Sequence, residues 1–197
     1  MEPGERHAVN EPGRWSLRHR ADSAGEEPAS VSRIGPGDWA ALRDVRLAAL
    51  RDSPDTFAST LERELALAEQ DWRQRAESAA WFVARQDSDL AGLVAVFPVP
   101  ESSPPTKWHL ISMWVAPRMR GRGVAALLVD AAAGHVAAAG AQRLTLWVAD
   151  GNDRAIAFYL RAGFLPTGQR QTYRRADSSE FDEEELVLEL AELARGI

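Results

Sequence analysis

The sequence predicts a mixed α/β domain in which one mostly antiparallel sheet of six to seven strands is flanked by about four helices. Apolar periodicity gives the order helix, helix, three strands, helix, strand, helix and two strands. Two apolar runs separated only by the polar residues 87–89 predict an antiparallel hairpin. Further along, a strand, a helix and a strand follow one another, which is typical of a right-handed crossover between parallel strands. The sheet is therefore expected to be mixed.

The first part of the chain differs in composition from the rest. Residues 1–30 are rich in Pro, Gly, Glu and Arg and lack periodic apolar positions. Such a segment cannot offset the entropy lost on ordering. The whole chain has 197 residues, of which 45% are hydrophobic, enough for one core. We expect a disordered tail over residues 1–30 and a single domain over residues 31–197.

The front half of that domain contains helices followed by strands. Asp38 is a candidate N-cap for a helix that runs to Pro54, and residues 57–78 hold further helix, which Ser59 or Thr60 could cap. Short apolar runs, which are typical of strands, come next. They read "AWFVARQ", "LAGLVAVFPV" and "WHLISMWVAP".

The back half alternates helix and strand. A helix over 124–139 is stopped by Gly140, a strand "RLTLWVAD" follows, and a helix over 153–162 ends at Gly163. Two final strands, over 164–173 and 185–190, flank the polar turn "RRADSSEFDEEE". This acidic turn could recognise a cationic substrate, although a charge run at a hairpin tip usually only keeps it solvated.

Composition excludes several classes of function. The formal net charge is −6, whereas general binders of nucleic acid or of anionic membranes need a cationic field. No apolar run is long enough to cross a membrane, and no secretory signal is evident, so we expect a cytoplasmic protein. The absence of cysteine excludes thiolate metal sites and a cysteinyl intermediate. The histidines do not cluster, so no metal is expected.

The stretch "WVAPRMRGRGVAALLVDAA" is the most informative part of the chain. A strand that passes through a glycine-rich turn into a helix presents unpaired N–H groups at the positive end of the helix dipole. Gly121 and Gly123 let the main chain approach an oxyanion closely, while Arg118, Arg120 and Arg122 add positive charge. The stretch predicts a site for a pyrophosphate with further negative charge nearby.

Two other interpretations fit the same residues. The arginines could simply solubilise an exposed loop. Alternatively, Gly121, Gly123 and Ala126 match a dinucleotide-binding fingerprint, with Asp150 at the end of the next strand. A dinucleotide-binding domain normally opens with this unit and continues with more strand–helix repeats, which do not follow here.

Together with a second motif, this stretch resembles the GNAT superfamily of acetyl-CoA-dependent N-acetyltransferases. The acyl-CoA signature of that superfamily is matched by "RGRGVA", and the later "NDRAIAFYLRAGF" is similar to its second signature. The early "RLAALRDSPDTFAST" also looks like the acceptor-side helices of many bacterial members. The resemblance covers about residues 31–190. It implies a sheet that splays between the strand before the phosphate loop and the next strand.

The resemblance also implies the cofactor, acetyl-CoA, and the residues that hold it. In the superfamily, the pantetheine arm pairs with the main chain of the strand before the loop, and the loop binds the phosphates. A tyrosine on the last helix acts there as general acid toward the departing thiolate. The implied cofactor-binding residues are Met113, Trp114, Val115, Arg120, Gly121, Arg122, Gly123, Val124, Ala125, Asn152, Ala155 and Tyr159.

The catalytic residues implied are Tyr159 as general acid and His109 as general base. His109 begins the strand before the loop, where several members, including the serotonin N-acetyltransferases, place a His or Glu. Strand alternation puts it on one face with Ile111, Met113 and Val115. Each residue also has a plain structural interpretation, Tyr159 as an amphipathic core residue and His109 as a surface histidine.

Fewer signals identify the acceptor side. Phe57 and Glu62 are the candidate substrate-binding residues, and Glu62 or Glu64 could replace His109 as the base. Their spacing places Glu62 and Glu64 on different faces of a helix. Trp72 could line the acceptor pocket, but core packing is the expected role.

These residues predict an N-acetyltransferase that moves acetyl from acetyl-CoA to a primary amine by direct attack in a ternary complex. The alternative is an acyl-CoA-binding regulatory module on the same fold, without catalysis. The acceptor is expected to be a small-molecule amine or a protein amine, with no nucleic-acid or membrane partner. A homodimer is common among relatives and is therefore possible here.

Overall fold

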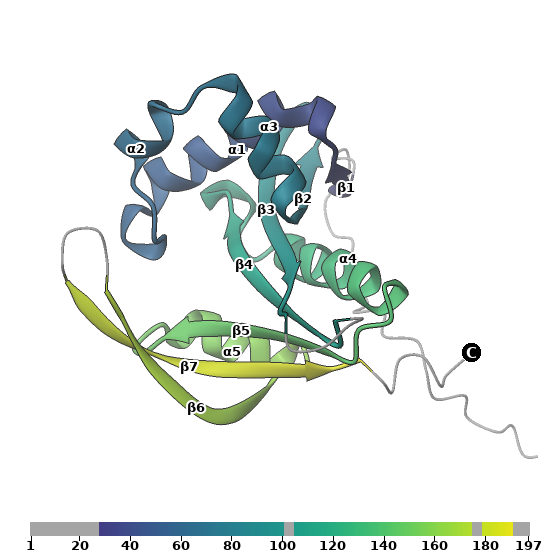
Figure 1. Ribbon diagram of the computed structural model, residues 1–197, viewed down its shortest axis with the longest axis vertical. Helices are drawn as coiled ribbons and strands as arrows, with labels where there is room; N and C mark the ends of the chain where they lie inside the picture. Colours follow the sequence, from purple (N-terminus) through teal and green to yellow (C-terminus); the bar gives the residue numbers. More distant parts are fainter. Residues whose placement is uncertain (1–27, 101–104, 175–178, 191–197) are drawn as a thin grey trace, which may run out of the picture.

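Seven strands form one sheet in the computed structural model, which describes residues 28–100, 105–174 and 179–190. Their order across the sheet is β1-β2-β3-β4-β5-β7-β6 (Figure 1). The strands are β1 (Ser30–Ile34), β2 (Ala80–Gln86), β3 (Asp89–Pro98), β4 (Lys107–Val115), β5 (Arg143–Ala149), β6 (Leu165–Arg174) and β7 (Glu180–Glu189). The expected mixed α/β fold is confirmed. Residues 1–27 of the expected tail lie outside the described residues.

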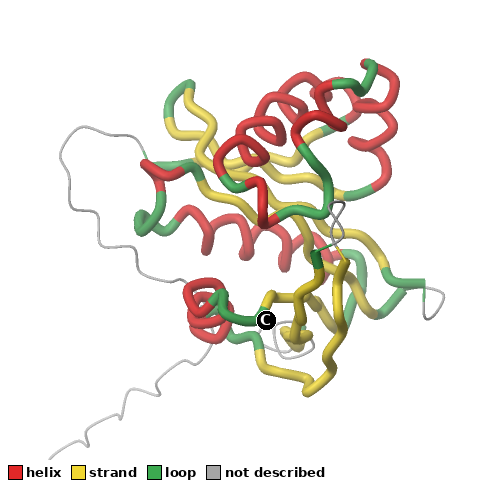
Figure 2. The backbone as a smooth tube through the Cα atoms, turned by 90° about the vertical axis from the view of Figure 1, so that its left-hand side faces the viewer, coloured by secondary structure: helices red, strands yellow, loops and turns green. Residues whose placement is uncertain are grey.

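Five α-helices in the described residues cover both faces of the sheet (Figure 2). They are α1 (Trp39–Asp52), α2 (Leu61–Leu65), α3 (Glu69–Ser78), α4 (Val124–Ala138) and α5 (Asp153–Arg161). The helix expected over 57–78 is thus two helices. Thr60 caps α2 by accepting a hydrogen bond from the N–H of Arg63, and a new helix starts where Asp71 accepts one from the N–H of Ala68. None of these helices is long and apolar enough to cross a membrane.

The sheet opens between β4 and β5. All neighbouring strands are antiparallel except these two, which run parallel and are joined through α4. They pair only over Lys107–His109 and Arg143–Thr145, and from there β5, β7 and β6 diverge as a separate arm (Figure 1). The expected splay is therefore confirmed. It leaves the β5-facing main-chain groups of β4 beyond His109 without ladder partners in β5.

A β-bulge in β4 changes which side chains share a face. Ser112 has φ of 58°, and the register with β3 shifts between the pairs Ala95–Ile111 and Leu93–Trp114. Cross-strand partners point to the same face. His109, Ile111 and Trp114 therefore share one face, and Val115 lies on the other. The expectation that Val115 shares the face of His109 is wrong, because the extra residue of the bulge reverses the alternation.

The acidic segment expected to form a turn is mostly strand. β7 begins at Glu180 and pairs with β6 over Glu180–Glu184 and again, after a register shift, at Leu186 and Val187. Its acidic side chains are matched by polar partners on β6: Arg174 pairs with Glu180, and Thr172 donates to Asp182 at 2.7 Å. These cross-strand contacts offset the repulsion among the acidic side chains of β7, so the segment forms a strand and not the predicted turn. Residues 175–178, at the tip, lie outside the described residues.

Candidate functional site

The turn before α4 has the main-chain geometry of an anion site. It follows a short 3-10 helix, Pro117–Met119, and contains Gly121 with φ of 81° and Gly123 with φ of 83°. Gly123 is the N-cap of α4, so the N–H groups of Val124 and Ala125 have no acceptor within the helix. A side chain at either glycine would be strained in this left-handed conformation. These N–H groups point outward from the N-terminus of α4, which is the arrangement that binds a phosphate.

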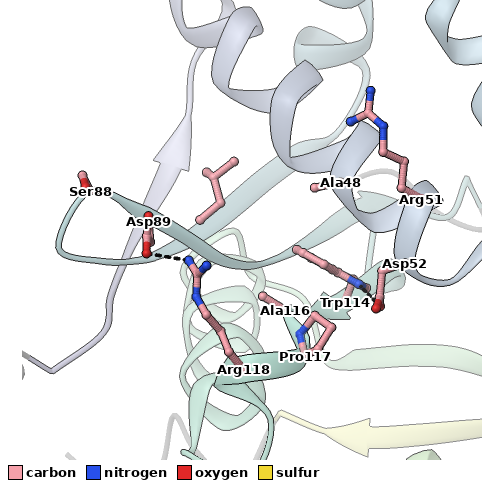
Figure 3. Close-up of a pocket in the computed structure, with 10 residues that line it drawn as sticks. Ala48, Arg51, Asp52, Ser88, Asp89, Trp114, Ala116, Pro117 and Arg118 are labelled. Atoms are coloured by element: carbon pink, nitrogen blue, oxygen red, sulfur yellow. Dashed lines mark hydrogen bonds and ion pairs between the residues drawn. The ribbon is translucent and has the colours of Figure 1, made fainter.

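Two arginines at the start of this turn bind other parts of the chain, and Figure 3 shows the contact of Arg118. Arg118 forms an exposed ion pair with Asp89, at 2.7 Å, in the β2–β3 hairpin. Arg120 donates from Nε to the carbonyl of Val115, at 3.0 Å, and forms an ion pair with Asp52. The sequence assigned Arg120 to the phosphates, whereas in the structure its guanidinium joins the turn to the end of α1.

Asp52 was not among the sequence-based candidates. Its carboxylate accepts hydrogen bonds from Trp114 Nε1 at 2.8 Å and from Ser53 Oγ at 2.7 Å, in addition to the ion pair with Arg120. Slight burial opposes ionisation, but these donors and the charge of Arg120 lower the pKa of Asp52. Asp52 thus stays ionised and connects α1 to β4 and the turn. No local pattern signals this, because Trp114 is 62 positions away in the sequence.

A groove of about 640 Å³ lies beside this contact (Figure 3). Its walls are α1, the β2–β3 hairpin and the entry to the turn. None of its lining residues comes from β5 or α5, so it is separate from the opening between β4 and β5. The lining residues are Ala48, Arg51, Asp52, Ser88, Asp89, Leu90, Trp114, Ala116, Pro117 and Arg118.

The candidate pantetheine-binding residues lie where β4 has left β5. Trp114 is buried, whereas Met113 and Val115 are half-buried. Since β4 pairs with β5 only as far as His109, main-chain groups on this edge are open to an extended ligand. The edge leads directly into the turn with the two left-handed glycines. A ligand with an extended arm and phosphates at one end therefore fits the described main chain.

Helix α5 supplies the second set of candidates. Asn152 caps the helix by accepting a hydrogen bond from the N–H of Ala155, at 3.2 Å, which a cofactor contact would not prevent. Tyr159 is only 6% exposed, with its ring 5.1 Å from that of Phe158 and 5.4 Å from that of Phe164. Burial raises the pKa of Tyr159 above its ordinary value, so the phenol keeps its proton. It can therefore donate a hydrogen bond.

His109 lies in the paired part of β4, apart from the opening. Its Nδ1 is 3.0 Å from Oγ1 of Thr145 on β5, and that hydroxyl donates to the carbonyl of Trp108 at 3.3 Å. This favours the tautomer with hydrogen on Nδ1, which leaves Nε2 as the basic nitrogen. Met113 lies four positions after His109, which places the two residues at most roughly 13 Å apart along the strand. The role of His109 as base stays a prediction and would need water to carry the proton.

Burial lowers the pKa of His109 from 6.5 to about 4, with Glu185 acting in the opposite direction and Lys107 adding to the decrease. In the unfolded chain the same imidazole would titrate near 6.5. Above pH 6.5 the imidazole is neutral in both states; as the pH falls from 6.5 toward 4, only the unfolded chain binds the proton, so the folded state loses stability. Between pH 7 and 5 the loss is about 2 kcal/mol.

We expect His109→Gln to lose less stability than the unmodified protein when the pH is lowered from 7 to 5. Urea unfolding at both pH values would measure the difference. His135 on α4, which contacts Phe82 and Trp108 by ring edges, provides the comparison: burial also lowers its pKa, so His135→Gln should reduce the loss as well, but by less than His109→Gln. Equal losses in the unmodified protein and in His109→Gln would show that His109 is not held neutral by the fold.

The acceptor-side candidates differ in their surroundings. Phe57 is half-buried beneath Arg46, whose Cζ lies 4.4 Å from the ring centroid. Glu62 is exposed on α2, whereas Glu64 is fully buried and paired with arginines, which confirms that they face different ways. Trp72 is fully buried, as core packing predicts. No three His, Asp or Glu side chains within the described ranges are grouped as a metal site.

The comparisons with known proteins agree with this geometry. The model of the acetyltransferase (GNAT) family matches residues 42–164. A GNAT-family acetyltransferase from Streptococcus pneumoniae is 18% identical over 82% of this chain and 98% of that chain, with a TM-score of 0.68. A search of curated proteins gave no match.

Two further solved structures share the fold. The yncA protein of Salmonella typhimurium, solved with its cofactor acetyl-CoA, is 13% identical over 83% of this chain and 95% of that chain, with a TM-score of 0.66. A ribosomal-protein-alanine N-acetyltransferase from Brucella melitensis is 19% identical over 81% and 99% of the two chains, with a TM-score of 0.64. Because the family model covers more than half of the sequence, the chain belongs to the GNAT family of acetyltransferases.

Proposed function

We propose that the protein is an N-acetyltransferase that moves acetyl from acetyl-CoA to a primary amine by direct attack in a ternary complex. The observation that carries this proposal is the left-handed glycine N-cap of α4 at the end of a strand that has separated from β5. Family membership supports it, as do two fold neighbours: one was solved with acetyl-CoA, and the other is a ribosomal-protein-alanine N-acetyltransferase.

The main chain would supply most of the contacts to the cofactor. The N–H groups of Gly123, Val124 and Ala125 would bind the pyrophosphate, aided by the side chain of Arg122. The free edge of β4 around Met113 would pair with the pantetheine arm. Such main-chain contacts do not depend on side-chain identity, which explains how a family with little sequence identity can share one cofactor.

Acetyl-CoA, when bound, supplies the acetyl group as a thioester. Main-chain donors of β4 would polarise the carbonyl of this thioester. The buried phenol of Tyr159 would donate a hydrogen bond to the departing sulfur. Because burial raises the pKa of Tyr159, the phenol acts mainly as a hydrogen-bond donor rather than as a strong acid. The chain has no cysteine, which fits direct attack by the amine without a thiol acyl-enzyme.

The amine must lose its proton before attack. Nε2 of His109 is the candidate acceptor, with exposed Glu62 as the alternative. A pKa of about 4 makes His109 a weak base, and this observation favours the second candidate function, an acyl-CoA-binding module without catalysis. The acceptor is a small-molecule or protein amine, and the proposed location is cytoplasmic. A homodimer remains part of the proposal.

We expect acetyl-CoA and coenzyme A to raise the melting temperature, whereas NAD and NADP leave it unchanged. A ligand that binds only the folded state at 100 times its Kd stabilises it by about 2.7 kcal/mol. Thermal unfolding with each compound would measure this. A rise with the coenzyme A compounds would be followed by an amine panel with thiol release as readout. A rise with NADP alone would contradict the cofactor assignment, and binding without turnover on any amine would favour the regulatory module.

A further inference from the structure

A buried cluster of charged side chains links the three acceptor-side helices to β4. Arg46 on α1 donates from Nε and Nη2 to the carboxylate of Glu64 on α2, at 3.1 to 3.2 Å. Arg75 on α3 binds the same carboxylate at 2.8 Å. The remaining end of the Arg46 guanidinium, Nη1, donates to Oγ of Ser112 at 3.3 Å. Ser112 is the residue with positive φ in the β4 bulge.

The cluster is unusual because its central members are removed from water. Arg46 is 6% exposed and Glu64 is fully buried. Burial lowers the pKa of Arg46 from its ordinary value. Burial also opposes ionisation of Glu64, yet hydrogen bonds and charge from Arg46 and then Arg75 hold its pKa below the ordinary value, so the pair is ionic. Burying ions costs desolvation energy, which makes such a pair weak evidence for stability but able to specify geometry.

Ser112 occupies a conformation that needs support. A non-glycine residue with φ of 58° is strained, and such residues persist where their surroundings hold them. Arg46 is bonded to its side chain across 66 positions of sequence. The bulge sets the direction of the following residues, and Trp114 and Val115 are two of the candidate pantetheine-binding residues. A guanidinium fixed by Glu64 is a rigid donor for this purpose.

We infer that Arg46 is a positioning residue: through Ser112 it holds the β4 bulge in place and couples the cofactor-binding edge of β4 to helices α1–α3. This inference rests on the proposed function, because the bulge matters for transfer only if β4 polarises the thioester. The coupling itself is a property of the chain without any ligand. It also places Phe57, which lies under the same guanidinium, in a fixed position relative to the bulge.

Three variants test the inference: Ser112→Ala, Ser112→Gly and Arg46→Lys. Ser112→Ala removes the hydrogen bond but keeps the strained φ, so the bulge should shift and kcat should fall by about tenfold, an effect on the scale of one misplaced catalytic contact. Ser112→Gly removes both the bond and the strain, so it should retain most of the activity. Arg46→Lys keeps the charge but loses the planar fork, and should behave like Ser112→Ala.

The Kd for coenzyme A should rise less than kcat falls in Ser112→Ala and Arg46→Lys, because only the pantetheine-binding edge of β4 shifts while the turn before α4 is untouched. Arg43→Lys is the matched control on the same helix, since among the described residues Arg43 pairs with exposed Asp44, at 3.9 Å, and not with the buried cluster. It should leave kcat unchanged. Activity of Ser112→Ala and Arg46→Lys equal to that of the unmodified protein would overturn the inference, because the bond from Arg46 to Ser112 would then not hold the bulge.

Hydrogen exchange without ligand distinguishes a failure of this inference from a failure of the proposed function. The amides of Met113 and Trp114 should exchange several-fold faster in Ser112→Ala and Arg46→Lys than in the unmodified protein or Arg43→Lys. If exchange rises in this way but the protein transfers no acetyl group, the coupling stands and the proposed function is wrong. If exchange is unchanged, Arg46 does not hold the bulge, whatever the activity.

Discussion

Gly123→Ala is expected to lower the affinity for acetyl-CoA by at least about tenfold, which corresponds to about 1.4 kcal/mol. Gly123 is the N-cap of α4 with φ of 83°, a conformation that costs an alanine about 1 to 2 kcal/mol. The strained turn would relax by moving the N–H groups of Val124 and Ala125 away from the position that a pyrophosphate requires. Isothermal titration with acetyl-CoA and with coenzyme A would measure the loss.

The other end of the same helix provides the control. Gly140 follows the C-terminus of α4 with φ of 82°, and a Cβ there would meet nothing within 4 Å. Gly140→Ala therefore introduces the same backbone strain far from the turn and should lower the melting temperature to a similar extent. Only Gly123→Ala should lose affinity. Similar affinity losses in both variants would attribute the effect to general destabilisation, and no loss in either would contradict the phosphate assignment.

The parts of the fold that sequence predicted correctly have local signals. Strand β4, helix α4 and strand β5 were predicted within two residues because apolar periodicity and the stop at Gly140 mark their ends. Strand β1 was missed because its five residues bury only Ile34, so it shows no alternating pattern. Its existence depends on pairing with β2, a contact between residues about 50 positions apart, and short-range patterns do not report such contacts.

The same distinction applies to the candidate site. The glycines of the turn and the cap at Asn152 are local features, so their geometry could be expected from sequence. The bulge at Ser112 carries no glycine or proline signal, and the face of Val115 was therefore assigned wrongly. The bond of Arg120 to Asp52 spans 68 positions, and only the folded chain brings such side chains together.

Tyr159→Phe is expected to lower kcat by about 100-fold, the lower end of what a positioned proton donor contributes. The substitution removes only the hydroxyl, while the ring keeps its contacts with Phe158 and Phe164. Affinity for coenzyme A should change by less than about twofold, because a donor that acts on the departing sulfur contributes mainly in the transition state. Steady-state kinetics with the best amine of a panel, together with direct binding of coenzyme A, would separate the two effects.

The chain contains only one other tyrosine, Tyr173, and the same substitution there provides the control. Tyr173 lies on β6 with its ring 5.4 Å from that of Phe181, so Tyr173→Phe removes an equivalent hydroxyl from the divergent arm of the sheet. It should leave kcat unchanged. If Tyr159→Phe also left kcat unchanged, its raised pKa would simply reflect an amphipathic core residue, and another group would have to stabilise the thiolate. If the loss were restored with a thioester whose leaving thiol is more acidic, the hydroxyl would be shown to act on the departing sulfur, because a better leaving group needs less help.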